Sequence, residues 1–261
     1  YQIILFDLDE TLCENLNVLG LNTKLYDKSK ELINNLTQNN NKVYIVTNNC
    51  RYTSKILETF FIKNNIIGIT EQNIITPLTK ICQKFKNKTI LICCSKMQKN
   101  YLEECGINIY KYSQDELPDA IVFHDIYSYN YEFIIEYSKV IGINKDIPVY
   151  LSDNDITYKN NGIIFPDMGM LIKGTGCTEF TVIGKPNPNY IDMLTIKDIS
   201  NVIMIGDSNT DYNFSKNIGC DFIHIKQENL DNFVFNNIKM CYEFNSIKSL
   251  YIKALERCHS N

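Results

Sequence analysis

The sequence predicts an α/β fold with a parallel sheet, and two observations support this prediction. Short apolar runs recur along the 261 residues, and helical stretches separate them. Runs that are apolar on both faces are typical of parallel strands that helices cover on each side. A chain of this length, with 44% hydrophobic and 21% charged residues, can bury a full core. We therefore expect one large domain or two unequal domains.

The apolar runs and the stretches between them place each element in turn. Strands are expected where the sequence reads IILF, VYIV, TILICC, AIVF, PVYL, VIMIG and DFIHI, at 3–6, 43–46, 89–94, 120–123, 148–151, 202–206 and 221–225. Helices are expected at about 27–39, 52–64, 130–142 and 211–218. A further short apolar run, FTVI, lies at 180–183. No internal repeat and no linker rich in Pro, Gly or Ser marks a domain boundary.

The charge and hydropathy of the chain argue against several classes of partner. The formal net charge is -4 and the pI is near 5.5, so the sequence has no basic footprint for nucleic acid or an anionic membrane. No apolar run is long enough to span a bilayer, and the N-terminus lacks a signal-peptide pattern, so we expect a cytoplasmic protein. The first residue is Tyr1 rather than Met, which leaves room for an upstream targeting segment.

The cysteines and histidines do not form a pattern for zinc or disulfides. The chain has ten Cys and three His but no CxxC pair. Cys93 and Cys94 lie inside an apolar run, where neighbouring side chains point to opposite faces. We expect these thiols to be reduced and to lie in the core.

Polar clusters follow several of the expected strands. They lie at Asp7–Thr11, Thr47–Asn49 and Gly206–Asp211, and Gly184–Pro186 follows the short run at 180–183. In an open parallel sheet, ligands bind at the carboxyl ends of the strands. The sequence therefore predicts a functional site built from these four clusters.

The carboxylates in these clusters predict a site for Mg²⁺. Asp7 and Asp9 are two residues apart, so in an extended segment both side chains face the same pocket. Asp207, from another strand end, adds a third negative charge, and a set of hard oxygen ligands suits Mg²⁺ shared with a phosphate. Asp211 is a further candidate ligand, and it can equally act through water or by orienting its neighbours.

The remaining polar residues suit phosphoryl transfer. Asp7 is the candidate nucleophile, which would form an aspartyl-phosphate. Asp9 could protonate the leaving oxygen and later accept a proton from water. Thr47 and Asn48 can donate hydrogen bonds to phosphoryl oxygens, and Lys185 can neutralise charge on them and on the nucleophile.

These clusters resemble the four motifs of the haloacid dehalogenase (HAD) superfamily of aspartate-nucleophile phosphatases. The motifs occur in order as Asp7, Asp9 and Thr11, then Thr47, then Lys185, then Asp207 and Asp211. Each motif alone is a weak signal. Their order, with each motif after an apolar strand, makes the combined signal strong.

The spacing is similar to that of the NagD-like class IIA branch, in which a large α/β cap is inserted between the second and third motifs. About 135 residues separate Thr47 from Lys185, far more than one crossover needs. The resemblance implies a Rossmann-like core at residues 1–75 and 181–261 and a C2-type cap domain at 76–180. It also implies Mg²⁺ dependence and hydrolysis of small phosphomonoesters. The branch usually has Gly where this chain has Glu10.

The resemblance further implies that Asp155 lies in a cap loop that faces the active site and selects the substrate. An Asx turn is the alternative for this residue. Asp207 and Asp211 could cap the helix that begins near residue 210, which is compatible with metal binding. Thr47, Asn48 and Asn49 could also form an ordinary turn between a strand and a helix.

The substrate class and the partners stay open at this stage. Sugar phosphates, nucleotides, pyridoxal phosphate and phosphoglycolate are all candidate substrates. Two other functions are a catalytically idle HAD fold that binds a ligand and a phosphotransferase to an acceptor other than water. A homo-oligomer is possible, because cap surfaces often carry such contacts in relatives.

Overall fold

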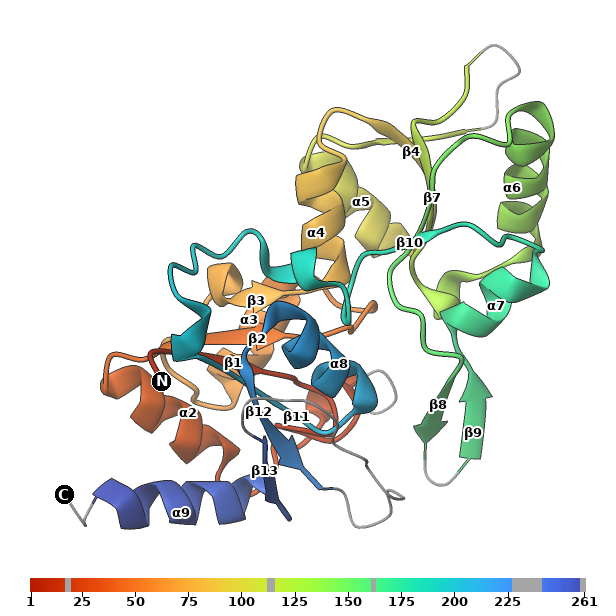
Figure 1. Ribbon diagram of the computed structural model, residues 1–261. Coiled ribbons are helices and arrows are strands. Elements are labelled where there is room, and N and C mark those ends of the chain that lie inside the picture. The colour runs from red at the N-terminus through yellow and green to blue at the C-terminus, as the bar shows by residue number, and fades with distance from the viewer. Residues whose placement is uncertain (17–19, 112–115, 161–162, 227–240, 259–261) are drawn as a thin grey trace. The chain divides into compact units, whose positions relative to one another are not determined.

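The computed structural model describes all residues except 17–19, 112–115, 161–162, 227–240 and 259–261 (Figure 1). The chain divides into two compact units, and each is described by itself. Unit 1 comprises Tyr1–Thr47, Ser54–Ile75 and Lys185–Asn261, and unit 2 comprises Asn48–Thr53 and Thr76–Gly184. The two units are thus interleaved along the sequence.

Unit 1 contains a six-stranded sheet in the order β13-β12-β11-β1-β2-β3, and all its strand pairs are parallel. The strands are β1 (Ile3–Phe6), β2 (Lys42–Val46), β3 (Ile74–Ile75), β11 (Val202–Gly206), β12 (Asp221–Ile225) and β13 (Cys241–Phe244). The helices are α2 (Ser29–Gln38), α3 (Ser54–Lys63), α8 (Asn209–Ile218) and α9 (Ile247–Cys258). Short 3₁₀ segments lie at Gly20–Asn22, Glu71–Asn73, Pro188–Ile191 and Ile199–Asn201.

The central strands of unit 1 are buried along their whole length. Every residue of β1, β11 and β12 is buried. Helix α8 packs on β11 and β12, and α2 packs on β2. This continuous burial confirms the expectation that runs apolar on both faces form parallel strands between layers of helix.

Unit 2 contains a five-stranded parallel sheet in the order β10-β7-β6-β4-β5. Its strands are β4 (Thr89–Cys93), β5 (Asn108–Ile109), β6 (Ala120–Phe123), β7 (Val149–Leu151) and β10 (Thr181–Val182). Its helices are α4 (Pro77–Lys84), α5 (Lys96–Glu104), α6 (Tyr131–Ile143) and α7 (Met168–Gly174), with a 3₁₀ segment at Ile126–Ser128. The strands β8 (Thr157–Asn160) and β9 (Ile163–Pro166) pair with each other as an antiparallel hairpin.

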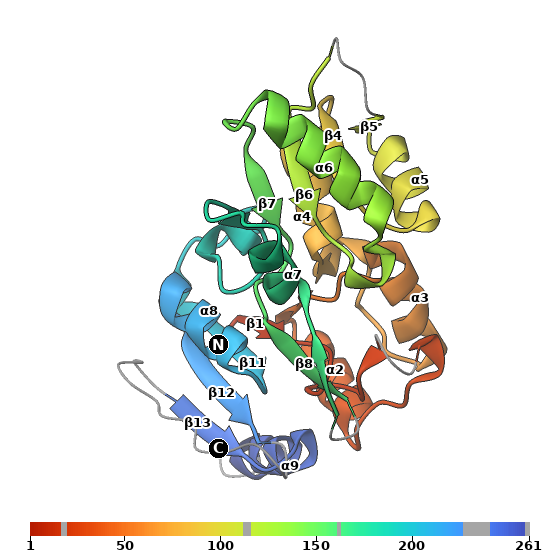
Figure 2. The ribbon, with the colours of Figure 1, turned by 90° about the vertical axis from the view of Figure 1, so that its right-hand side faces the viewer.

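Helices cover both faces of the unit 2 sheet. Phe133, Tyr137 and Val140 of α6 pack with Leu91 and Phe123 on one face, and Figure 2 shows α6 lying across the strands. On the other face, residues of α4 and α5 pack against a second set of strand residues, among them Ile90, Ile92 and Val122. Successive residues of one strand thus enter different core clusters, as the alternation of a β-strand requires.

The strands and helices expected from the sequence are confirmed to within two residues at each end, and the short run at 180–183 contains β10. The short strands β3, β5 and β13, the hairpin β8–β9, and the helices α4, α5, α7 and α9 were not expected. The predicted division places residues 48–53 and 181–184 in the core, whereas the structure places them in unit 2. The physical reason is that β10 pairs with β7 and that Gln98 of α5 hydrogen-bonds the carbonyl oxygens of Cys50 and Arg51.

No helix in the described part of the chain combines the length and the hydrophobicity needed to cross a bilayer.

Candidate active site

Three adjacent strands of unit 1 carry predicted site residues at their carboxyl ends. β1 lies between β2 and β11, and Phe6 pairs in register with Ile45 on one side and Ile205 on the other. Because the three strands are parallel, the residues that follow them come together at one edge of the sheet. Asp7, Thr47 and Asp207 occupy these positions.

Three buried carboxylates and one lysine form the centre of the site. One carboxylate oxygen each from Asp7, Asp207 and Asp211 lies within 4.8 Å of the others. Lys185 donates to Asp7 Oδ1 at 2.6 Å and to Asp211 Oδ1 at 2.5 Å. All four residues are less than 10% exposed. The structure therefore brings together Asp7, Lys185, Asp207 and Asp211. The first and the last of these residues are 204 positions apart in the chain.

The cluster holds more negative than positive charge. Burial, together with the negative charge of Asp211, raises the pKa of Asp7 to about 7, although Lys185 opposes the rise. Burial and the charges of Asp7 and Asp211 also raise the pKa of Asp207 well above its usual range. Burial disfavours the Lys185 ammonium, but Asp211 and Asp7 overcome this and raise its pKa.

These shifts fit the requirement for a divalent cation. Three carboxylates and one ammonium leave two negative charges uncompensated in a buried site, and like charges this close disfavour ionisation. Hard carboxylate oxygens are the ligands that Mg²⁺ prefers. In the described part of the chain, the carboxylates of Asp7, Asp207 and Asp211 lie close enough together to hold such an ion.

Asp211 has a second, structural role. Ser208 is the N-cap of α8 and accepts a hydrogen bond from the Asp211 amide, while Asp211 Oδ2 accepts from the Ser208 amide and hydroxyl. This reciprocal pair is a capping box. The helix-capping alternative therefore holds for Asp211, whereas the N-cap itself is Ser208 rather than Asp207. Since Asp211 Oδ1 accepts from Lys185, each of its oxygens already has a partner.

Gly206 is required by the close approach of Asp211. A Cβ atom built on Gly206 would lie 2.5 Å from the carboxylate carbon of Asp211. Contacts of this kind are shorter than van der Waals distance, so any side chain at residue 206 would displace the carboxylate. Because Gly206, the last residue of β11, has no side chain, the Asp211 carboxylate can occupy that space.

Thr11 ties two of the acids to each other. Its buried hydroxyl lies 3.3 Å from Asp7 Oδ2 and 3.1 Å from Asp207 Oδ1. A hydroxyl has a single proton, so it donates to one carboxylate at a time. The third residue of the first motif therefore positions the acids supplied by β1 and β11.

Asp9 and Glu10 occupy the turn after β1. The Asp9 carboxylate accepts from the Leu16 amide at 2.6 Å and does not belong to the three-acid cluster. Glu10 adopts a left-handed backbone with φ 62°, a conformation that favours glycine. Its carboxylate accepts from the Tyr26 hydroxyl at 2.7 Å. This backbone conformation fits the Gly that the resemblance implies at this position.

Thr47 is held by a residue that the sequence patterns did not single out. Its side chain is 1% exposed, and its carbonyl oxygen accepts from the hydroxyl of Tyr190 at 2.5 Å. Tyr190 is fully buried in the core of unit 1. The sequence motifs are polar clusters that follow strands. Tyr190 is an aromatic residue in a 3₁₀ segment, so these motifs do not indicate that it supports Thr47.

Asn48 belongs to unit 2, where it lies close to Gly184. A Cβ on Gly184 would collide with Asn48 Oδ1 and would lie 2.6 Å from the carbonyl oxygen of Ser152. The turn that follows is made by Asn49, whose side-chain oxygen accepts from the Arg51 and Tyr52 amides. The alternative of an ordinary turn residue therefore describes Asn49.

Asp155 is exposed and lies in the loop between β7 and β8 of unit 2. Its amide donates to Asp153 Oδ1 at 2.7 Å, so Asp153 supplies the Asx turn. Its carbonyl accepts from the Gly169 amide at 3.0 Å, which ties this loop to the first turn of α7. Asp155 as the residue that selects the substrate stays a prediction.

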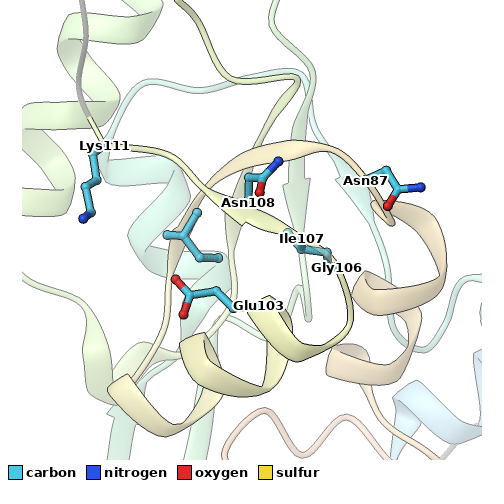
Figure 3. Close-up of a pocket in the computed structure, with 7 residues that line it drawn as sticks. Asn87, Glu103, Gly106, Ile107, Asn108 and Lys111 are labelled. Atoms are coloured by element: carbon cyan, nitrogen blue, oxygen red, sulfur yellow. The ribbon is translucent and has the colours of Figure 1, made fainter.

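A shallow pocket in unit 2 holds none of the predicted site residues. It is lined by the end of α5 and by β5, with Glu103, Gly106, Asn108 and Lys111 around it (Figure 3).

Two family profiles match the sequence. Residues 4–108 match the haloacid dehalogenase-like hydrolases, and residues 182–232 match a second HAD-hydrolase-like profile. The two matches include the first, second, third and fourth motifs. A search of curated proteins found no significant match.

Solved structures share the fold over nearly the whole chain. A p-nitrophenyl phosphatase from Archaeoglobus fulgidus has a TM-score of 0.80 at 19% identity, with 97% of this chain and 98% of that chain covered. A putative nagD protein has a TM-score of 0.76 at 20% identity, with 98% of each chain covered. A glycerol phosphate phosphatase from Mycobacterium tuberculosis, solved with magnesium, has a TM-score of 0.68 at 18% identity, with 86% and 68% covered.

The chain belongs to the haloacid dehalogenase superfamily. It shares its fold with the p-nitrophenyl phosphatase and the putative nagD protein, and the parallel sheet of unit 1 is Rossmann-like.

Proposed function

We propose that this protein is a Mg²⁺-dependent phosphatase of small phosphomonoesters. The observation that carries the proposal is the buried cluster of Asp7, Asp207 and Asp211 with Lys185 between two of its acids. Structural neighbours bear the names p-nitrophenyl phosphatase and glycerol phosphate phosphatase, which agrees with this reaction class. Bound Mg²⁺ would supply positive charge to the phosphoryl oxygens and to the acids, with Asp7 and Asp207 as its proposed ligands and Asp211 within reach.

The first step transfers the phosphoryl group to the protein. A carboxylate oxygen of Asp7 forms a bond to phosphorus while the bond from phosphorus to the ester oxygen breaks. Asp9 gives its proton to the departing alkoxide, so an alcohol leaves and Asp7 carries the phosphoryl group as an acyl phosphate. Lys185, 2.6 Å from Asp7 Oδ1, orients the nucleophile and reduces the repulsion between the two anions.

The second step returns Asp7 to its initial state. Asp9, now ionised, takes a proton from a water molecule whose oxygen attacks phosphorus. The bond from phosphorus to Asp7 breaks, and inorganic phosphate leaves. Thr47 and Asn48 are proposed to donate hydrogen bonds to the phosphoryl oxygens in both steps. Asp155 is proposed to contact the part of the ester that differs between substrates.

A panel of phosphate esters, each with Mg²⁺ and with a chelator, tests the reaction class. The panel contains p-nitrophenyl phosphate, glycerol phosphate, a sugar phosphate, a nucleotide, pyridoxal phosphate and phosphoglycolate. We expect release of inorganic phosphate from at least one ester with Mg²⁺, and loss of that activity with chelator. Tight binding of an ester without phosphate release would favour an idle binding protein. Consumption of ester without free phosphate would favour a phosphotransferase.

Asp9→Asn tests the role of the general acid. We expect this variant to lose about 100-fold or more in turnover of an alkyl ester, because the alkoxide can no longer be protonated as it leaves. The loss should be much smaller in the first turnover of p-nitrophenyl phosphate, whose leaving group needs little protonation. Single-turnover rates on the two substrates measure the difference. Equal losses would contradict the assignment of Asp9 as the acid.

A further inference from the structure

His224 forms a hydrogen bond with the main chain of Asp207, which is a candidate metal ligand. His224 belongs to β12 and pairs in register with Gly206, the residue before Asp207. Its Nε2 lies 3.1 Å from the carbonyl oxygen of Asp207. A carbonyl oxygen can only accept, so Nε2 carries the hydrogen and donates it.

The position of this ring is well defined. His224 is 2% exposed, and its ring stacks on Phe222 with centroids 6.2 Å apart and planes at 22°. On the other side of the ring, Nδ1 lies 3.8 Å from Glu243 Oε2. Packing against Phe222 therefore holds the ring so that Nε2 faces the Asp207 carbonyl.

Asp207 is thus held at both ends. Its carboxylate is within hydrogen-bond distance of the Thr11 hydroxyl, and its carbonyl accepts from His224. The side chain alone can rotate about two bonds, so the position of a carboxylate also depends on how firmly its main chain is held. Residues that orient a ligand in this way commonly change metal affinity by about 10- to 100-fold when they are removed.

We propose that His224 is a positioning residue for Mg²⁺ at Asp207, which it fixes through the main-chain carbonyl. This inference rests on the proposed function, since it assumes that the acid cluster binds Mg²⁺. His224 touches neither substrate nor the reacting atoms. Its removal weakens the binding of the ion, whereas the chemistry at Asp7 proceeds once the ion is bound.

The test compares His224→Leu with His224→Gln. Leucine fills similar space but leaves the buried Asp207 carbonyl without its donor, whereas the glutamine amide reaches about as far as Nε2 and restores a donor. We expect His224→Leu to raise the Mg²⁺ dissociation constant about 10-fold, measured by calorimetry on metal-free protein and by the Mg²⁺-induced rise in melting temperature. His224→Gln should return most of the affinity, and turnover at saturating Mg²⁺ should stay within a few-fold of wild type.

His124→Leu is the matched control. His124 is 1% exposed, lies in unit 2 and bonds Ser152 Oγ through Nδ1 at 2.7 Å. The same substitution there should lower the melting temperature without changing the Mg²⁺ dissociation constant. If His224→Leu does not fold, His224→Asn replaces it, because its shorter amide does not reach the Asp207 carbonyl.

The outcomes separate the two proposals. Failure of the wild-type protein to bind Mg²⁺ would overturn the proposed function. Wild-type binding with an unchanged dissociation constant in both His224→Leu and His224→Asn would overturn the positioning role alone. A shift of equal size in His124→Leu would also overturn it, because the effect would then reflect a general loss of stability.

Discussion

Asp7→Asn should abolish turnover of every phosphate ester that the wild-type protein hydrolyses. An amide has no ionised oxygen to attack phosphorus, and loss of a covalent nucleophile commonly costs about 10⁴-fold or more. The substitution preserves shape, so the fold should survive. Steady-state release of inorganic phosphate measures the loss, and circular dichroism checks the fold.

The same variant should be more stable than wild type when both are free of metal at high pH. In the folded state, burial and the charge of Asp211 raise the pKa of Asp7 from its ordinary value of 3.8 to about 7. Because the folded state favours the protonated acid, ionised Asp7 destabilises the fold as pH rises from about 4 to 7. The neutral amide avoids this cost, so the difference in melting temperature should be larger at pH 8 than at pH 5.

Asp27→Asn is the control for both measurements. Asp27 is exposed and pairs with Lys248 at 2.9 Å on the surface of unit 1. This variant should keep wild-type turnover, and its melting temperature should change little at either pH. Normal turnover in Asp7→Asn would refute Asp7 as the nucleophile.

Gly206→Ala should damage both stability and turnover. The new methyl group would lie 2.5 Å from the carboxylate carbon and from Oδ2 of Asp211. This carboxylate cannot move away without losing its hydrogen bonds to Ser208 and Lys185. We expect the free energy of unfolding to fall by about 2 kcal/mol, as for other forced contacts in a core. Turnover should fall about 100-fold, because displaced Asp211 releases the lysine that orients the nucleophile.

Gly142→Ala is the matched control for this substitution. Gly142 lies in α6, and a Cβ there would have nothing within 4 Å. Alanine at this site should raise the free energy of unfolding by up to about 1 kcal/mol and leave turnover unchanged. Denaturant unfolding and initial rates on the most active ester measure both variants. Wild-type stability and turnover in Gly206→Ala would show that Asp211 does not need its observed position.

Much of the core could be predicted because its signals are local. The run at 3–6 is apolar throughout and those at 202–206 and 221–225 are mostly apolar, and such runs commonly form buried parallel strands. Parallel strands present their carboxyl ends at one edge, so Asp7 and Asp207 could be placed together before any contact was known. The hairpin β8–β9 could not be predicted in this way. Its apolar residues Ile163 and Ile164 are exposed, so apolar character does not indicate burial there.

The residues that hold the site in place could not be predicted in the same way. Tyr190 hydrogen-bonds Thr47, which lies 143 positions away in the chain. Gly206 leaves room for Asp211, 5 positions away. His224 hydrogen-bonds Asp207, 17 positions away. Nothing in the neighbouring sequence distinguishes such a tyrosine or histidine from one that merely fills the core.

The sequence by itself determined the fold class, the order of the central elements and the identity of the reactive groups, because these follow from local hydrophobic patterns and from short polar motifs after strands. Only the tertiary structure decided that Glu10 takes a left-handed turn, that Asp211 caps α8 while it pairs with Lys185, and that His224 supports Asp207. The physical reason is that hydrogen bonds and steric limits depend on distances of a few ångströms between segments, which the chain sets only when it packs.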